Sequence, residues 1–338
     1  IGTKEMQKAK EKASFPFIDF PVIPLYFRRA AINCAIGMAR SNILFKAENF
    51  FAAPVYYKGM YKERKEDSIL LKVYTKEKWK WSRYRFTGRQ LPENVEVLSP
   101  IIDASQKQAY LQIPIRKQIV GIHPVKEQIK EVEKVLALSF PGNNSIAVGA
   151  ILRKNGDLEK TMFFQGGLEL KAKKKKWKRK WEREIGKEKE NCLKKIENLN
   201  QFYAHRTSRR IIEFCKANGV TIIVIPNYQK TIDFSKKGYL KTDNFEWIGR
   251  RVIRYLKYKA FSEGILVSRV PTYHISDCCN ECGAKIKRYN TGHIPSQNYY
   301  GGQLFLCPNG HQGNSGLNTA RNVGKRFLSY YKEENRKE

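Results

Sequence analysis

The spacing of hydrophobic residues changes several times along the chain, and each change predicts a different kind of element. Over residues 26–41, small apolar residues such as Ala31, Ala35 and Met38 recur at helical spacing, which predicts a closely packed helix. From residue 51 to residue 142 the pattern changes to short strand-like runs separated by turn residues. Several short strands of this kind are typical of a small β-barrel.

One of these runs, residues 78–86, interleaves basic and aromatic residues (KWKWSRYRF). Alternation with a period of two predicts a strand with its rings on one face and its charges on the other. Such a strand is either an ordinary half-buried strand with a solvated outer face or a surface that binds the RNA backbone. The sequence leaves both interpretations open.

The second half of the chain predicts a layered α/β architecture. Apolar runs at 145–152 and 161–164 flank Asn155-Gly156, a tight-turn signal that predicts a β-hairpin. Helices and buried strands alternate after it, with helices over 171–217 (one or two), 244–262 and 317–331, and strands over 221–225 and 265–270.

The chain is strongly basic, with 64 Lys and Arg against 32 Asp and Glu and a formal net charge of +32. Residues 171–195 alone hold 13 basic residues against 4 acidic ones. Charge spread along the whole chain and interleaved with aromatic rings favours a nucleic-acid partner. A protein of the membrane surface would concentrate its charge on one helix or tail. The chain has no run of 18 apolar residues and a polar start, so we expect neither a membrane span nor a secretory signal.

Four potential metal ligands fall at zinc spacing. Cys279 and Cys282 form a C-x-x-C knuckle, and Cys307 and His311 follow as C-x-x-x-H. Thiolate and imidazole donors are the ligands of closed, structural zinc sites, so the sequence predicts such a site. Two nearby residues are alternative ligands, Cys278 and His293. The remaining cysteines lie in apolar or helical contexts and are predicted to be buried thiols: Cys34, Cys192 and Cys215.

These motifs together resemble the transposon-encoded TnpB family, relatives of the type V CRISPR effectors with a RuvC-like domain of RNase H fold. The third motif of that family reads D-x-N-A-A-x-N-I, and residues 316–323 of this chain read GLNTARNV. Residues 258–260 (YKA), Gly264-Ile265, the cysteine knuckle and residues 27–33 (FRRAAIN) are also similar to segments of the family.

The resemblance implies a multidomain α+β protein of five parts. They are a helical recognition segment (1–50), a wedge-like or OB-like β-barrel domain (51–142), a RuvC-like domain of RNase H fold (143–270), an inserted zinc-ribbon module (271–313), and a final RuvC helix with a basic tail (314–338).

The chain departs from the family where metal-binding carboxylates are expected. The family's first motif, G-I-D-L-G, corresponds here to SIAVG, so Ala147 stands in place of an acid; Pro226 and Gly316 occupy the second and third acidic positions. A two-metal nuclease needs acidic side chains to hold a pair of cations about 4 Å apart. The sequence therefore predicts a RuvC-like fold that does not cut. An active enzyme would need acids from elsewhere, for which the candidates are Asp157, Glu213 and Asp233.

The resemblance implies a protein that binds a guide RNA and double-stranded target DNA beside a short flanking motif. Without cleavage, the output would be repression of transcription or recruitment of a transposition, transcription or effector protein. We expect structural zinc and guide RNA as cofactors, no membrane partner, and a location at the bacterial nucleoid in the cytoplasm. Two alternatives remain: an active RNA-guided endonuclease with relocated carboxylates, and an RNA-independent DNA-binding accessory protein of a transposon.

The basic residues predicted to contact nucleic acid lie on the predicted helices and on the basic–aromatic strand. They are Arg28, Arg29, Arg40, Lys80, Arg83, Arg85, Lys173, Lys175, Lys178, Arg179, Arg206, Arg209, Arg210, Arg250, Arg254 and Lys259.

Overall fold

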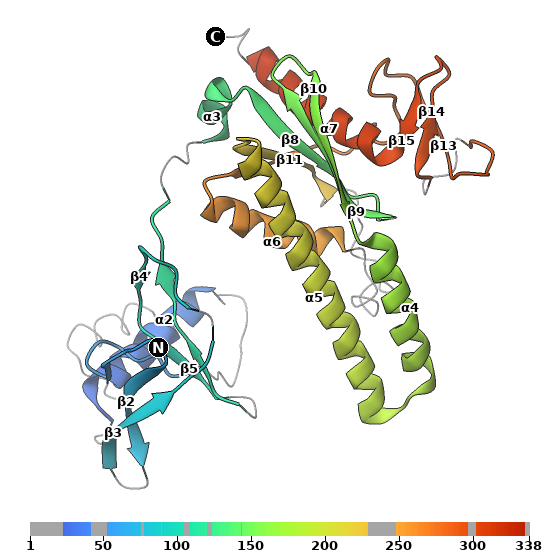
Figure 1. Cartoon of the computed structure of the whole chain (residues 1–338). Helices are drawn as coiled ribbons and strands as arrows, with labels where there is room; N and C mark the ends of the chain where they lie inside the picture. Colours follow the sequence, from blue (N-terminus) through green and yellow to red (C-terminus); the bar gives the residue numbers. More distant parts are fainter. Residues whose placement is uncertain are drawn as a thin grey trace. The chain divides into compact units, whose positions relative to one another are not determined.

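The computed structural model describes residues 23–41, 53–75, 78–88, 90–104, 108–119, 124–142, 144–228, 248–296 and 302–334 (Figure 1). The chain divides into two compact units, residues 1–118 and 119–338, and each is described by itself. The mixed α+β composition confirms the predicted fold class at this coarse level. Among the described helices, none is long and apolar enough to cross a membrane.

The first unit contains one helix and several short strands. Its elements are α2 (Leu25–Ser41), β1 (Tyr61–Lys62), β2 (Ser68–Thr75), β3 (Lys78–Arg85), β4 (Glu96–Val97), β5 (Ile101–Asp103), β6 (Tyr110–Gln112) and β7 (Ile115–Arg116). Helix α2 confirms the helix predicted from small-residue spacing. The strands form separate sheets, β1-β2-β3, β4-β7 and β5-β6, and the described residues contain no closed barrel. The predicted barrel is therefore not confirmed, since strands of two or three residues pair only locally.

The faces of β3 differ from the prediction. Its ladder with β2 is regular from Ser68↔Arg85 to Thr75↔Lys78, so residues of the same parity share a face. The basic–aromatic alternation changes phase at Ser82, however. Trp81 therefore shares a face with Arg83 and not with Tyr84. Each face of the strand carries both rings and charges, and the expected separation of the two is wrong.

The second unit is built on a five-stranded sheet of order β10-β9-β8-β11-β12. Its strands are β8 (Lys134–Ser139), β9 (Ser145–Arg153), β10 (Leu158–Gln165), β11 (Ile222–Pro226) and β12 (Leu266–Val270). Strands β8, β9 and β10 pair antiparallel, whereas β8, β11 and β12 run parallel. The predicted hairpin and both later strands are confirmed.

Strand β8 corrects the predicted domain boundary. Residues 134–139 were assigned to the barrel domain ending at 142, yet β8 lies at the centre of the sheet and pairs with both β9 and β11. The division between the two units falls after residue 118. The physical reason is burial: from Val135 to Ser139 every residue of β8 is buried, so this strand belongs inside the larger core.

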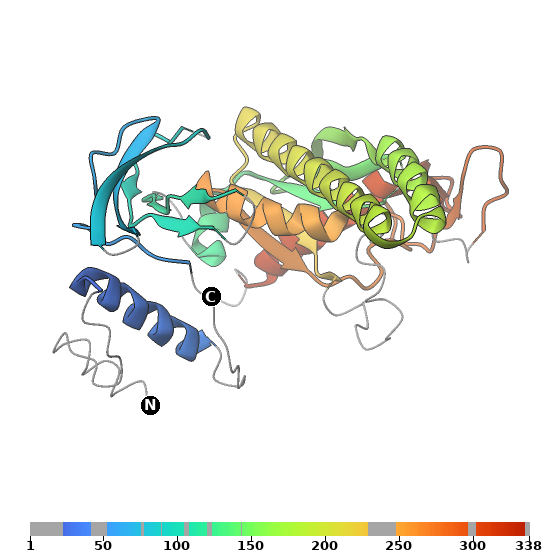
Figure 2. The same cartoon turned by 90° about the horizontal axis from the view of Figure 1, so that it is seen from below.

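Helices cover both faces of this sheet (Figures 1 and 2). They are α3 (Val125–Glu131), α4 (Gly167–Arg183), α5 (Gly186–Ala217), α6 (Gly249–Ser262) and α7 (Ser315–Glu334). Leu136 and Leu138 of β8 pack into a core with α5 and α6, whereas Val135 and Ala137 pack into a second core with α7. The two long helices predicted within 171–217 are α4 and α5. The predicted start of the helix over 244–262 lies partly outside the described residues.

Helix α7 approaches the sheet closely because it presents Gly324. A Cβ at Gly324 would overlap Leu152 of β9 and lie 3.0 Å from the Cβ of Ala137.

Before α7, three short antiparallel strands form a separate small sheet. They are β13 (Lys287–Tyr289), β14 (Leu304–Leu306) and β15 (Gln312–Asn314).

Candidate functional site

The carboxyl ends of the parallel strands meet the start of α7. Strand β8 ends at Ser139 and β11 ends at Pro226, and parallel neighbours present their carboxyl ends at one edge, where α/β sheets place their sites. The hydroxyl of Ser139 donates a hydrogen bond of 2.7 Å to the carbonyl of Gly316, in the first turn of α7. We call this region, defined by Ser139, Pro226 and Gly316, the carboxyl edge.

These three positions also share one face of the sheet. Side chains two residues apart along a strand point to the same side. Ser139 lies two residues after Ala137, and Pro226 lies two residues after Val224; both Ala137 and Val224 pack into the core beneath α7. The carboxyl edge therefore gathers a hydroxyl, a pyrrolidine ring and a glycine, and no carboxylate.

The assignment of Ala147 as a vacated acidic position is wrong. Ala147 is fully buried in β9 and packs in the core on the α5 side, with Tyr203 and Phe164. The next residue, Val148, points the other way, since its Cγ2 lies 3.1 Å from where a Cβ on Gly316 would be. An acid at position 147 would point away from Gly316, and Ser139 is the residue of the first strand that meets it. Pro226 and Gly316 do lie at this edge, as the sequence predicted.

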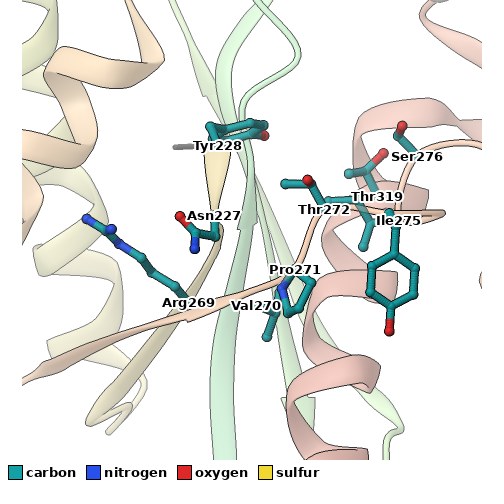
Figure 3. Close-up of a pocket in the computed structure, with 10 residues that line it drawn as sticks. Asn227, Tyr228, Arg269, Val270, Pro271, Thr272, Ile275, Ser276 and Thr319 are labelled. Carbon is teal, nitrogen blue, oxygen red and sulfur yellow. The ribbon is translucent and has the colours of Figure 1, made fainter. Parts of the chain in front are cut away.

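An open pocket of about 630 Å³ adjoins the carboxyl edge (Figure 3). It is lined by Asn227, Tyr228, Arg269, Val270, Pro271, Thr272, Tyr273, Ile275, Ser276 and Thr319. Hydroxyl-bearing side chains from three segments surround it in Figure 3, among them Tyr228, Thr272 and Thr319. The buried Oδ1 atom of Asn227 has no hydrogen-bond partner among the described residues. Among the described residues that line this pocket there is no Asp or Glu, so none of them offers an anionic oxygen to a divalent cation.

Tyr228 links the ends of two strands. Burial raises the pKa of its phenol well above the usual range, and a hydrogen bond from the backbone of Phe140, which follows β8, opposes this shift. The neutral phenol adds no negative charge to this edge.

The candidate relocated acids lie elsewhere or outside the described residues. Asp157 accepts a hydrogen bond of 2.6 Å from Asn155 at the β9–β10 turn. Glu213 forms an exposed ion pair of 2.8 Å with Arg209 on α5. Neither residue lines the pocket, and Asp233 lies outside the described residues.

The four predicted zinc ligands come together. The donor atoms of Cys279, Cys282, Cys307 and His311 all lie within 4.8 Å of one another, and the two sulfurs of Cys282 and Cys307 are 3.3 Å apart. The buried Nδ1 atom of His311 has no hydrogen-bond partner among the described residues, which fits a metal ligand. A three-thiolate, one-imidazole set at this spacing suits tetrahedral Zn²⁺. We call these four residues the cysteine cluster.

Electrostatics favour the thiolate in part of this cluster. A hydrogen bond from the backbone of Ala284, followed by the contact with Cys307, lowers the pKa of Cys282 to about 6. Zinc binds the thiolate form, so this ligand is already prepared for the ion near neutral pH.

The Asn-rich start of α7 holds the knuckle by its backbone. Asn318 accepts a hydrogen bond of 2.8 Å from the backbone N–H of Asn280 and donates one of 2.8 Å to the carbonyl of Cys278. Asn322, one turn later, donates to the same carbonyl at 2.8 Å. The N-T-A-R-N motif therefore positions the metal-binding loop.

The structure does not bring the two alternative ligands into the cluster. His293 faces the carbonyl of Thr291 at 3.3 Å. Cys278 groups instead with His274 and Asp277, a grouping that spacing alone did not suggest.

Most of the predicted nucleic-acid contacts are exposed. Residues Arg40, Lys80, Arg83, Arg85, Lys173, Lys175, Lys178, Arg179, Arg206, Arg209 and Arg254 are exposed, and Arg28, Arg29, Arg210, Arg250 and Lys259 are partly buried. Some of their charges are engaged internally: Arg83 pairs with Glu63, and Lys173 pairs with Glu169 at 2.6 Å. Lys259 donates to the His205 carbonyl at 2.9 Å and to Ser208 at 2.8 Å. Lys259 therefore connects α6 to α5, and a role in RNA contact is not needed to explain it.

Comparison with known proteins gives one family match. Residues 250–323 match the sequence profile of the TNB domain of Cas12f1-like proteins. The matched segment runs from α6 through the cysteine cluster into α7, and it confirms the predicted resemblance to the TnpB and type V group there. No curated protein sequence matches this chain.

Solved structures give only distant likenesses. A Cas12f1–sgRNA–target DNA complex has 14% identity and a TM-score of 0.43, with coverage of 96% of this chain and 85% of the other. C2c1 of Alicyclobacillus acidoterrestris with single-guide RNA has 10% identity, a TM-score of 0.48 and coverage of 80% and 50%. The mini RNA-guided endonuclease CRISPR-Cas_phi3 has 11% identity, a TM-score of 0.45 and coverage of 95% and 69%. Similarity at this level does not by itself indicate a shared function.

Proposed function

We propose that this chain binds a guide RNA and complementary double-stranded DNA without cutting the DNA. It would act by blocking transcription or by recruiting a partner protein. The observation that carries this proposal is the carboxyl edge, where Ser139, Pro226 and Gly316 converge without a carboxylate. Two-metal hydrolysis needs acidic ligands for both cations, and the described residues offer none there.

Several features support guided nucleic-acid binding. Residues 250–323 match the TNB domain of Cas12f1-like proteins, and the similar Cas12f1 and C2c1 were solved in complex with single-guide RNA, the former also with target DNA. The net charge of +32 suits a polyanionic partner, since basic side chains gain affinity by displacing counterions from phosphates. The sheet order and strand directions fit the RNase H-like domain that the resemblance implies.

The test begins with RNA that co-purifies with the full chain. Sequencing should find one dominant structured RNA ending in a variable segment, and that segment's genomic match would give the DNA target. The loaded complex should then retain labelled target DNA in a gel-shift assay with Mg²⁺ or Mn²⁺ and leave it intact. Cleavage that depends on either metal would overturn the nuclease-dead part of the proposal.

Failure of the RNA step would favour the alternative of an RNA-independent DNA-binding accessory protein. In that case the protein without RNA should bind duplex DNA with sequence preference. The salt dependence of that binding would report the number of phosphates neutralised.

A further inference from the structure

A second group of metal-binding side chains lies beside the cysteine cluster. The imidazole of His274, the carboxylate of Asp277 and the thiol of Cys278 place their donor atoms within 4.8 Å of one another. His274 Nδ1 and Asp277 Oδ2 are 3.1 Å apart. Neither the cysteine cluster nor the carboxyl edge uses these residues. We propose that they form a second, independent metal site that binds Zn²⁺.

The donor set identifies the class of ion. One imidazole nitrogen, one carboxylate oxygen and one thiolate sulfur are all ligands that Zn²⁺ accepts, whereas Ca²⁺ and Mg²⁺ prefer oxygen ligands alone. Three protein ligands leave one tetrahedral position for water or an external ligand. The His274 side chain is 62% exposed, so solvent reaches this position. The site is therefore open, in contrast to the closed four-ligand cluster.

The backbone that carries the three ligands is held in place by α7. Arg326 donates hydrogen bonds to the carbonyls of Pro271 and Tyr273, at 2.9 and 2.5 Å. Asn322 donates to the carbonyl of Ile275 at 3.0 Å as well as to that of Cys278. The carbonyls on either side of His274 and the carbonyl of Cys278 itself are thus fixed. A site whose ligands are fixed before the ion arrives loses less conformational freedom on binding.

The backbone of His274 has an unusual conformation. Its φ is +54°, in the left-handed region that residues other than glycine rarely adopt. This conformation belongs to the turn that brings His274 back to face Asp277, three residues later. Such outliers gather at functional sites because the surrounding structure must maintain them.

Nearby basic side chains lower the Zn²⁺ affinity expected for this site. Lys285 and Arg326 lie near the Cys278 thiol, and Arg288 lies near Asp277. These groups balance the negative charge of Asp277 when no ion is bound, and they repel an incoming divalent cation. We therefore expect this site to bind Zn²⁺ more weakly than the cysteine cluster and to lose it first to a chelator.

Zinc content of the full chain tests the proposal. Protein purified with added Zn²⁺ should contain two zinc ions per chain by elemental analysis, and His274→Ala and Cys278→Ser should each contain one. His293→Ala is the matched control: it removes an exposed histidine of the same module that lies outside both groups, and it should keep two. The circular dichroism spectrum should be unchanged in His274→Ala, which shows that the variant folds.

A second readout assigns the ions to the sites. Graded chelation of the wild type should release one ion before the other, and His274→Ala should lack the early phase only. Cys282→Ser should lack the late phase. Equal zinc content in wild type and His274→Ala, or a wild-type chain with one ion that only Cys282→Ser loses, would overturn the proposal. The outcome does not depend on whether the chain binds RNA.

Discussion

The carboxyl edge and the cysteine cluster lie along the same helix but differ in what they can do. The carbonyl of Gly316, in the first turn of α7, accepts a hydrogen bond from the Ser139 hydroxyl. Farther along the same helix, Asn318 and Asn322 hold the knuckle. The cluster brings together all four of its potential ligands, whereas the edge brings together no carboxylate. A closed zinc site stabilises a fold without taking part in chemistry. The comparison teaches that one helix can carry a complete set of potential zinc ligands beside an edge whose three described positions supply no acidic side chain.

The largest expected effect comes from breaking the cluster. Cys282→Ser should remove one zinc ion and unfold the small β13–β15 sheet, because structural zinc contributes on the order of 10 kcal/mol to small zinc domains. Elemental analysis and limited proteolysis check this, with new cleavage expected between residues 279 and 311. Cys34→Ser, in the first unit, is the control and should change neither readout. Normal protease resistance of Cys282→Ser after loss of this zinc ion would show that the cluster is not structural.

A pair of acidic substitutions tests which residue belongs to the carboxyl edge. Ala147→Asp buries an unpaired carboxylate in the α5-side core and should destabilise the unit by roughly 3–5 kcal/mol. Ser139→Asp places its carboxylate at the carboxyl edge. It should lower the urea unfolding midpoint by less than Ala147→Asp does. In the RNA-loaded triple variant Ser139→Asp, Pro226→Glu, Gly316→Asp, we expect Mg²⁺-dependent DNA cleavage to rise above the wild-type level. The same triple built with Ala147→Asp should not cut; cleavage by it in preference to the first would contradict our assignment.

The packing of α7 against the sheet gives a smaller effect. Gly324→Ala inserts a methyl group into Leu152 and should cost about 1–3 kcal/mol, as overpacked cores do. The urea midpoint of the second unit measures this. Gly37→Ala is a matched control on a helix, since a Cβ there meets nothing within 4 Å. Equal midpoints for the two variants would show that α7 sits further from the sheet than described.

The smallest effect concerns a cysteine outside the cluster. Burial raises the pKa of Cys215 to about 12, compared with about 8.5 for a free thiol. The neutral thiol is thus favoured by folding, so this contribution to stability is present below about pH 8.5 and is lost as pH rises toward 12. In native protein at pH 9, alkylation mapped by mass spectrometry should spare Cys215 and modify it only in urea. Rapid native modification would contradict its burial.

The sequence predicted the elements whose signals are local. Long helices, the 145–164 hairpin and the two later strands follow from apolar spacing. The four-residue cysteine cluster follows from ligand spacing within short loops. The barrel was predicted wrongly as a closed structure because short, locally paired strands and a closed barrel share the same local sequence pattern. The described residues of the first unit contain only the separate short sheets.

The carboxyl edge was the hardest part to predict because it depends on strand pairing. Two consecutive apolar runs, 134–139 and 145–153, both read as buried strands, and only their partners reveal which lies beside β11. Placing the first acidic position of the family in the second run led to Ala147 and missed Ser139. A usable signal was present: the first run ends in a small polar residue shortly before Pro141-Gly142, a pair that marks the end of a strand.

The asparagine contacts of α7 have a consequence for engineering. Asn318 and Asn322 bind main-chain groups of Ile275, Cys278 and Asn280, and Asn318 also accepts a hydrogen bond of 2.8 Å from the Asn280 side chain. A knuckle of equal loop length that keeps Asn280 and Glu281, the partners of Asn318 and Arg321, can therefore be seated on the same helix. The zinc-ribbon module could therefore be replaced as a unit. Ribbons with other surface side chains, grafted onto α7, would change the binding surface of the protein without a redesign of its core.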